Sequence, residues 1–259
     1  MPPPPGSVTI GTFDGLHRGH QQLIALAHGA AQRAGLVTTV VTFDRHPLST
    51  VCPERAPRLL TTLDQKLRLL DGLGVVDHVV IVPFDEWRSR QRAEDFVTEV
   101  VAGFAAAKVV VVGQGFRFGA GQGGDVGLLG RLGRRHGFDV ISARLEADGS
   151  ALAPYSSTRV RRLVAAGDLA GAQQLLGRPF EVMCRVSSST GPLELVAERD
   201  QCLPPPDVYV GRVRARRAGA LDAVETPFVV SSARRDGRPT PRGPGHGPHG
   251  VRRPAVATG

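Results

Sequence analysis

Short apolar runs alternate with longer amphipathic segments through residues 7–180. The apolar runs are rich in β-branched residues, and the predicted strands span 7–13, 37–43, 78–82, 108–112 and 138–143. The amphipathic segments carry apolar residues at helical spacing, and the predicted helices span 20–34, 64–73, 93–106, 128–136, 156–166 and 169–176. This alternation predicts an α/β fold with a parallel sheet flanked by helices on both faces. Ligands of such sheets bind beyond the carboxyl ends of the strands.

The pattern changes after residue 180. Residues 181–230 hold short β-like pieces, such as 208–213, and no clear helical pattern. Residues 231–259 are rich in Arg, Gly, Pro and His and have few large apolar side chains. Such a segment cannot bury enough apolar surface to become ordered. We therefore predict an α/β domain over 1–180, a short β-rich unit over 181–230 and a disordered basic tail over 231–259.

Composition narrows the class of partners. The 259-residue chain has a formal net charge of +8, but only 5% of its residues are aromatic and no nucleic-acid-binding module is visible. It has no apolar run of about 18 residues and no apolar N-terminal leader. Cys52, Cys184 and Cys202 are far apart and lack metal-ligand spacing. We expect no nucleic-acid partner, no membrane segment and a cytoplasmic location, and the sequence leaves the oligomeric state open.

The densest polar chemistry lies between the first predicted strand and the first predicted helix. Residues 11–20 read Gly-Thr-Phe-Asp-Gly-Leu-His-Arg-Gly-His. His17 and His20 are three positions apart, so both imidazoles face the same way at the start of a helix. A helix N-terminus attracts anions through its unpaired N–H groups and its dipole. Gly19 leaves room for a nucleotide near the backbone. The turn therefore predicts a phosphate site.

Two further polar residues near this turn have two interpretations each. Asp14 is suited either to help place Mg²⁺ or to hold the turn through an Asx hydrogen bond. His46, after the second predicted strand, either contacts a phosphate or serves the fold. The sequence favours neither interpretation, so the metal ligands stay unassigned.

A second polar helix start is expected at residues 155–161, Tyr-Ser-Ser-Thr-Arg-Val-Arg. Hydroxyl groups at an N-cap, together with unpaired N–H groups, form an anion site. Ser157 and Thr158 supply hydroxyls, and Arg161, one turn into the helix, can hold a phosphate with two hydrogen bonds. Taken alone, the segment also fits an ordinary helix cap with a solvated arginine.

Two aromatic residues flank an arginine after the fourth predicted strand. Residues 112–119 read Val-Gly-Gln-Gly-Phe-Arg-Phe-Gly. Phe116 and Phe118 offer a flat apolar wall for an aromatic ring system, and Arg117 offers a cation for a phosphate. Packing in the protein core is the other interpretation of the two phenylalanines.

These motifs resemble known families. The tetrad at 17–20 resembles the His-x-Gly-His signature of the nucleotidylyltransferase superfamily. The whole stretch 11–20 resembles the N-terminal domain of the prokaryotic bifunctional riboflavin kinase/FMN adenylyltransferase (FAD synthetase) family. The likeness continues in order through residues 42–47, 60–62, 82–85, 93–97, 112–119 and 155–161.

The resemblance implies a Rossmann-like nucleotidylyltransferase domain that transfers AMP from ATP to FMN and releases FAD and pyrophosphate, with Mg²⁺ as cofactor. It implies catalytic roles for His17, His20 and Arg161. It implies that ATP is bound by Gly11, Thr12, Phe13, Gly19, Ser157, Thr158 and Arg161. It implies that the flavin is bound by Phe116, Phe118, His46 and Pro47.

The chain departs from the family pattern at two positions. Gly115 stands where the family has Asp or Asn, and Arg45 stands where the family has the first proline of Phe-x-Pro-His-Pro. These departures keep open an adenylyltransferase that acts on a modified flavin or another phosphorylated acceptor. A flavin- or nucleotide-binding relative without turnover is a further alternative.

The kinase half of this family has signatures that this sequence lacks. Neither a Gly-Asp-x-x-Gly-Arg loop nor a Pro-Thr-Ala-Asn segment is found, although residues 177–180 and 203–213 resemble parts of the kinase region. We therefore interpret 181–230 as a truncated or degenerate kinase remnant and expect no riboflavin kinase activity. A working bifunctional enzyme is the alternative, and it would phosphorylate riboflavin.

Overall fold

The computed structural model describes residues 4–145, 155–186, 195–217 and 220–230. Contacts between Cα atoms divide the chain into two compact units, Met1–Pro204 and Pro205–Gly259. The tail expected at 231–259 lies outside the described residues. The boundary expected at residue 180 stays a prediction.

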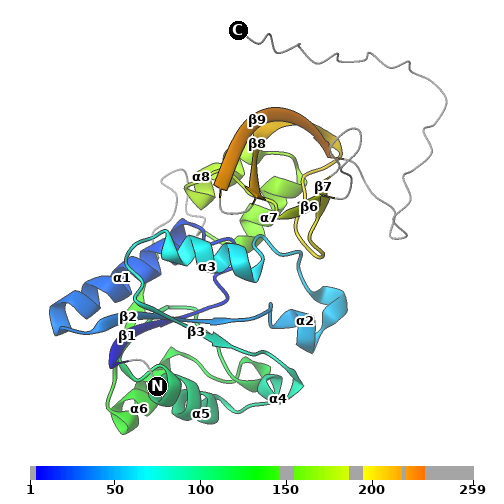
Figure 1. Cartoon of the computed structure of the whole chain (residues 1–259). Helices are drawn as coiled ribbons and strands as arrows, with labels where there is room; N and C mark the ends of the chain where they lie inside the picture. Colours follow the sequence, from blue (N-terminus) through cyan, green and yellow to red (C-terminus); the bar gives the residue numbers. More distant parts are fainter. Residues whose placement is uncertain (1–3, 146–154, 187–194, 218–219, 231–259) are drawn as a thin grey trace, which may run out of the picture. The chain divides into compact units, whose positions relative to one another are not determined.

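A five-stranded parallel sheet forms the centre of the first unit (Figure 1). Its strands lie in the order β3-β2-β1-β4-β5. They span Gly6–Ile10 (β1), Val37–Phe43 (β2), His78–Val82 (β3), Ala107–Gly113 (β4) and Asp139–Ala143 (β5). The chain crosses from one half of the sheet to the other between β3 and β4, which makes the β1–β4 pair the switch point where such sheets bind ligands. This arrangement confirms the predicted α/β fold.

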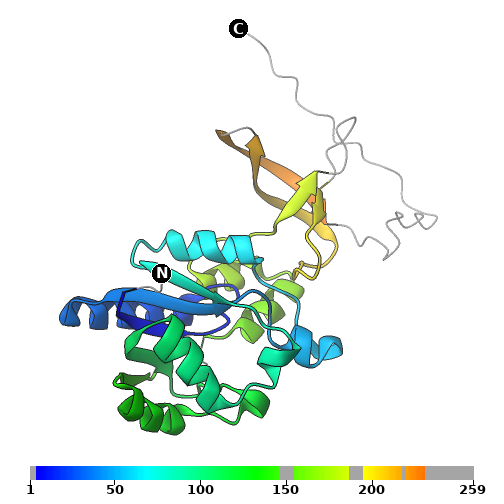
Figure 2. The same ribbon diagram turned by 60° about the horizontal axis from the view of Figure 1, so that its bottom comes forward.

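Helices cover both faces of the sheet, as Figure 1 and the turned view in Figure 2 show. On one face lie α1 (Arg18–Ala34) and α3 (Leu63–Asp71). On the other lie α4 (Glu86–Ser89), α5 (Ala93–Phe96), the π-helix η2 (Val97–Phe104) and α6 (Val126–His136). Successive strand residues point to opposite faces, so Val40 packs in the cluster with Ile24, whereas Val41 packs in the cluster with Val97.

Further helices connect or flank these layers. They are α2 (Leu48–Val51), the 3₁₀ helices η1 (Pro53–Arg55) and η3 (Ala120–Gln122), α7 (Ser157–Ala165) and α8 (Leu169–Leu176). The last two helices share an apolar cluster with Leu60, which lies just before α3. Packing against Leu60 therefore holds α7 close to the loop that precedes α3.

The first strand and the third helix differ from their predictions. The first strand ends at Ile10 rather than at residue 13, because Phe13 has a φ of 48° and so leaves extended geometry. The helix expected over 93–106 is a single α turn, Ala93–Phe96, followed by the π-helix Val97–Phe104. A period of 3.6 residues in the sequence does not distinguish these two helical windings.

Antiparallel pairs follow the parallel sheet in the chain. The strands β6 (Cys184–Val186) and β7 (Leu195–Ala197) pair within the first unit. The strands β8 (Asp207–Arg217) and β9 (Ala220–Val230) pair over 11 residues each in the second. The short strand expected at 208–213 is thus part of a longer hairpin. The apolar pattern marks only the middle of β8, and pairing with β9 extends the strand in both directions.

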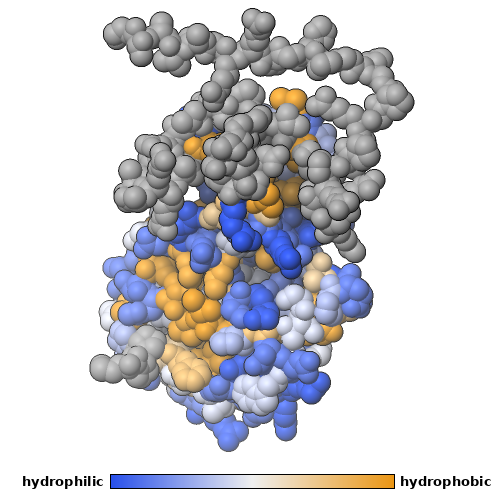
Figure 3. Space-filling view, turned by 45° about the vertical axis from the view of Figure 1, so that its right-hand side comes forward, coloured by the Kyte–Doolittle hydropathy of each residue, from blue (hydrophilic) through white to orange (hydrophobic). Residues whose placement is uncertain are grey.

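The surface of the described residues is mixed in polarity. Figure 3 shows an apolar area bordered by hydrophilic residues on the face turned forward. Exposed apolar side chains include Val51, Trp87 and Ile81, the last on the edge strand β3. Among the described residues, no helix combines the length and apolar character that a bilayer span requires.

Candidate active site

The turn between β1 and α1 is tightly wound and buried. Phe13 and Leu16 have φ angles of 48° and 41°, and both side chains are fully packed in the protein. Gly15 between them has a φ of 79°. Three left-handed residues reverse the chain within a few positions, which costs conformational energy that the packing must offset. The turn therefore presents His17 at a fixed place at the start of α1.

His17 is itself the N-cap of α1, so the helix begins earlier than the predicted residue 20. Its Nδ1 accepts a hydrogen bond from the backbone N–H of His20 at 3.3 Å. Because Nδ1 is the acceptor, the neutral imidazole carries its proton on Nε2. The rings of His17 and His20 stack with their centroids 3.7 Å apart. The two histidines thus act as one aromatic pair at a helix N-terminus, as the spacing predicts.

Both imidazoles are neutral at pH 7. Burial, with smaller effects from the charges of Arg161 and Arg178, lowers the pKa of His17 to about 4. Burial and the neighbouring His17 also hold the pKa of His20 well below its usual range. The Nδ1 atom of His20 is buried and has no hydrogen-bond partner. A buried ring nitrogen without a partner is costly, and a ligand that reaches it would satisfy it.

The start of α7 meets this turn directly. The hydroxyl of Ser157 donates to the carbonyl oxygen of Asp14 at 2.8 Å, and Arg161 Nη2 lies 2.5 Å from Asp14 Oδ2. Arg161 Nε also donates to the carbonyl oxygen of Arg58 at 2.6 Å. Thr158, in the first turn of α7, is exposed. The two helix starts that the sequence predicts to cooperate therefore lie side by side, joined through Asp14.

Asp14 connects three segments of the chain. Its carboxylate accepts hydrogen bonds from the backbone N–H groups of Leu60 and Thr61 and from the Thr61 hydroxyl, in addition to Arg161. Only 4% of the residue is exposed. Both carboxylate oxygens are engaged by donors, which favours the structural interpretation of Asp14 over a metal ligand. The part of the chain that the structure describes contains no group of three or more His, Cys, Asp or Glu side chains that could hold a metal ion.

Gly19 is where α1 and the segment before α7 come closest. A Cβ atom at this position would lie 3.0 Å from the Cβ atom of Tyr155. The small residue thus permits the two helix starts to pack together. The nucleotide contacts expected of Gly11, Thr12, Phe13 and Gly19 stay predictions, and Phe13 has its side chain wholly within the apolar cluster around Ile24.

The two predicted flavin residues after β4 differ in their surroundings. Phe118 is 7% exposed and belongs to the main core, with its ring 6.1 Å from that of Phe96. Phe116 is half-buried and stacks on Phe118 at 5.4 Å. The core interpretation therefore applies to Phe118, and Phe116 presents the more accessible ring. Gly115, beside it, is exposed, and a Cβ atom there would meet no other atom within 4 Å.

His46 and Pro47 lie after β2, at the start of α2. His46 Nδ1 accepts a hydrogen bond from the backbone N–H of Leu48 at 3.2 Å, and Pro47 is the N-cap of α2. Burial, and then the charge of Arg161, lowers the pKa of His46. Within the described ranges, no ring contact joins Phe116 or Phe118 to the paired histidines. The structure therefore joins the two predicted nucleotide helix starts and places His46 within reach of the charge of Arg161, whereas Phe116 and Phe118 pair with each other.

Sequence reasoning missed two cations beside the turn, the buried Lys66 and the partly buried Arg178. Lys66 on α3 donates to the carbonyl oxygen of Thr12, and Arg178, after α8, donates to the carbonyl oxygen of Gly15 at 2.8 Å. Burial lowers the pKa of both groups. Lys66 occupies the same face of its helix as the buried Leu70, four positions later. The signal in the sequence that would have identified Lys66 was a lysine on the apolar face of a predicted helix.

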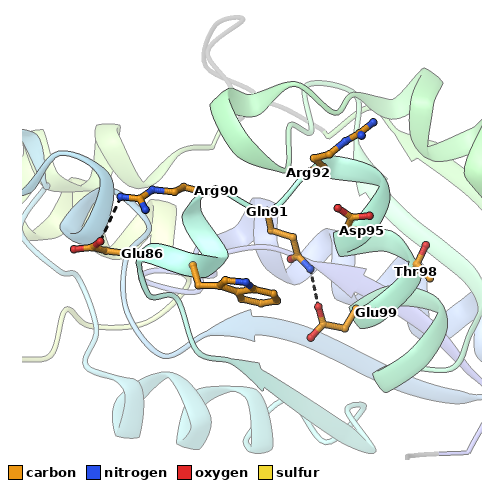
Figure 4. Close-up of a pocket in the computed structure, with 8 residues that line it drawn as sticks. Glu86, Arg90, Gln91, Arg92, Asp95, Thr98 and Glu99 are labelled. Atoms are coloured by element: carbon orange, nitrogen blue, oxygen red, sulfur yellow. Dashed lines mark hydrogen bonds and ion pairs between the residues drawn. The ribbon is translucent and has the colours of Figure 1, made fainter.

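A pocket elsewhere in the fold does not involve these residues. It has a volume of about 740 Å³ and is lined by residues of α4, α5, η2 and the link between α4 and α5, including Trp87, Arg90 and Asp95. Figure 4 shows Gln91 pointing to Glu99 and Arg90 pointing to Glu86 within it. Four of its polar side chains form these two pairs, and none of the predicted site residues lines it. It adds nothing to the candidate active site.

Comparisons with known proteins identify relatives of this chain. The family model described as FAD synthetase matches residues 3–158. A bifunctional riboflavin kinase/FMN adenylyltransferase from Escherichia coli (strain K12) is 39% identical over 179 residues, which are 69% of this chain and 56% of that protein. A shorter relative from Geobacillus thermodenitrificans is 38% identical over 178 residues, which are 68% of this chain and 92% of that protein.

A solved structure shares the fold. The crystal structure of a macrolide-efflux protein from Streptococcus pneumoniae superposes with a TM-score of 0.74 at 26% identity, covering 88% of this chain and 74% of that chain. The present chain spans little more than half the length of the Escherichia coli relative. The matched region includes both helix starts that meet at Asp14. The chain belongs to the FAD synthetase family.

Proposed function

We propose that this chain is an FMN adenylyltransferase that transfers AMP from ATP to FMN and releases FAD and pyrophosphate. The observation that carries the proposal is the junction of the two helix starts at Asp14, through the 2.8 Å hydrogen bond from Ser157 and the 2.5 Å contact from Arg161. Two helix N-termini that converge supply backbone N–H groups and dipoles for a single polyphosphate. The family and its relatives supply the identity of the acceptor.

In the proposed reaction an oxygen of the FMN phosphate attacks the α-phosphorus of ATP. The bond from that phosphorus to the bridging oxygen of the β-phosphate breaks, and pyrophosphate leaves with the electron pair. No covalent enzyme intermediate is needed, so the protein positions the reactants and stabilises negative charge on phosphate oxygens. His17, through Nε2–H, and His20 are proposed to do this at α1. Thr158 and Arg161 are proposed to hold the leaving pyrophosphate at α7.

Mg²⁺ is proposed to reach this site with the nucleotide. The residues present do not form a protein cage for a cation, because Asp14 is engaged by donors from three segments. Mg²⁺ commonly keeps several waters and is held by substrate phosphates with one or two carboxylates at most. Its contribution when bound would be neutralisation of phosphate charge. The protein's own groups would then orient the triphosphate.

We further propose that the 259-residue chain does not phosphorylate riboflavin. The proposal is supported by the lack of the two kinase motifs in its sequence. It is also supported by the antiparallel pairs β6–β7 and β8–β9, which are two-stranded in the described residues. A single experiment tests both proposals: purified protein with ATP and Mg²⁺ receives either FMN or riboflavin, and chromatography follows FAD and FMN. FAD from FMN, with no FMN from riboflavin, is the expected result.

A second acceptor class has one observation in its favour. The space beside Gly115 is open, since a Cβ atom there would meet nothing within 4 Å, and this position follows β4 next to Phe116. A flavin phosphate with an additional ring substituent would therefore meet no side chain at residue 115. Competition between FMN and such a modified flavin phosphate, measured as the ratio of kcat/KM values, distinguishes the two acceptors.

A further inference from the structure

The Lys66 ammonium lies beside the carboxyl ends of the neighbouring strands β1 and β2. Only 6% of the residue is exposed. Its Nζ donates to three oxygens: the carbonyl oxygen of Thr12 at 3.0 Å, the hydroxyl of Thr42 at 3.1 Å and the carbonyl oxygen of Phe43 at 2.8 Å. A lysine ammonium has three donors, so this cage uses all of them. Lys66 therefore joins the segment after β1 to the end of β2.

Composition makes this lysine unusual. The sequence holds 32 basic residues other than histidine, and only Lys66 and Lys108 among them are lysines. Lys108 is exposed on β4. Lys66 provides a compact ammonium group, which fits three converging oxygens. The planar guanidinium of an arginine does not fit them. The choice of side chain thus follows the geometry of the cage.

The cage is costly for stability alone. Among the described residues, no carboxylate lies within ion-pair distance of the Lys66 ammonium. Burying a charge without an ion pair is unfavourable, and an apolar residue at this position would extend the stripe that ends in Leu70. The hydrogen-bonded ammonium therefore needs a reason other than folding.

The oxygens that Lys66 holds belong to the two segments expected to bind the two substrates. Thr12 lies in the proposed nucleotide turn, and Phe43 leads directly into residues 44–47 of the proposed acceptor segment. We infer that Lys66 is a positioning residue that fixes the distance between these segments and places a positive charge behind the bound phosphates. This inference rests on the proposed function.

The electrostatic surroundings support this role. Burial lowers the pKa of Lys66 to about 8, against the opposing influence of Asp14 and Asp44. The charged and titratable groups that face it are Asp14 from the turn, His20 from α1, and Asp44 and His46 after β2. A polyphosphate nearby favours the charged ammonium, so nucleotide binding will raise the pKa of Lys66. Near pH 8, binding will therefore take up protons.

Nuclear magnetic resonance of lysine-labelled protein tests this inference directly, because only two lysine side chains give signals. The Lys108→Arg variant assigns them and is the matched control. We expect the Lys66 side chain to titrate near pH 8 in the free protein and about one unit higher with α,β-methylene-ATP bound. An unchanged titration midpoint, with nucleotide binding established by calorimetry, would overturn the inference. This readout needs no FAD formation, so it separates the inference from the proposed reaction.

Kinetics give a second test. Lys66→Met, which preserves length and removes the charge, is expected to lower kcat/KM for FAD formation by at least about tenfold in a protein that still folds. Lys108→Met should match the wild type. In the wild type, kcat/KM should fall as pH rises through about 8, and this limb should be missing in Lys66→Met. A folded Lys66→Met protein with wild-type kcat/KM and an unchanged pH profile would refute the positioning role.

Discussion

The guanidinium of Arg161 lies 2.5 Å from the carboxylate of Asp14, with side-chain exposures of 15% and 6%. The two residues are 147 positions apart in the sequence. Their contact brings the start of α7 against the turn that precedes α1. The same carboxylate also accepts two backbone N–H groups from the loop before α3. Asp14 and Arg161 thus fix the relative placement of the elements that the proposed reaction requires.

Loss of the charge on Asp14 should destabilise the fold. Asp14→Asn leaves Arg161 as a buried cation without a counter-charge, which typically costs about 3 kcal/mol. Urea unfolding measures the change. Asp200→Asn is the matched control, because Asp200 pairs with Arg58 at 3.1 Å on the surface, where such pairs contribute about 1 kcal/mol or less. Equal effects of the two substitutions would show that the Asp14 pair is no stronger than a surface pair.

The lowered pKa of His17 predicts that the free energy of unfolding depends on pH. Its pKa is about 4 in the folded protein, against 6.5 for a free imidazole. Between these values the unfolded chain binds more protons, so the free energy of unfolding falls as pH decreases from about 6.5 to 4, by on the order of 3 kcal/mol in total. His17→Asn retains an N-cap acceptor but does not titrate, so its unfolding free energy should vary less over this interval. Identical pH dependence in both proteins would contradict the buried neutral imidazole.

Substitution of Phe116 should affect FMN binding, whereas substitution of Phe118 should affect stability. Phe118→Ala removes a ring from the main core and should cost about 3 kcal/mol of unfolding free energy. Phe116→Ala should leave most of the stability but raise KM for FMN about tenfold, through loss of an aromatic contact. Denaturant titration and initial-rate kinetics on both variants distinguish these effects. A Phe116→Ala protein with unchanged KM for FMN would remove Phe116 from the flavin site.

Gly15 should tolerate no side chain. Its φ is 79°, and a Cβ atom would lie 2.7 Å from Leu60 Cδ1 in the packed interior. Gly15→Ala combines backbone strain with overpacking and should cost about 2–3 kcal/mol. Gly35 shares a positive φ but has no atom within 4 Å of its Cβ position, so Gly35→Ala should cost only about 1 kcal/mol. Thermal unfolding of the two variants compares them, and similar melting temperatures would show that Leu60 moves aside freely.

Much of this arrangement could be predicted from local patterns. Runs such as Val37–Phe43 and the serine cap of α7 follow periodicity and N-cap chemistry, which act over a few residues. The left-handed Phe13 could not be predicted, because tertiary packing of its ring overrides its backbone preference. The hydrogen bonds of Lys66 and Asp14 reach residues from about 20 to nearly 150 positions away, and one sequence gives no information on such pairings.

The hydroxyl of Thr158 and the imidazole of His20 lie at the first turns of different helices, and FAD formation depends on both if they serve one triphosphate. The most direct test is single-turnover conversion of ATP and FMN to FAD and pyrophosphate by the wild type, His20→Ala and Thr158→Val. We predict FAD formation by the wild type, a rate about 100-fold lower for His20→Ala and about tenfold lower for Thr158→Val, with both variants folded. No FAD from a wild type that binds ATP, or a wild-type rate in either variant, would contradict the account.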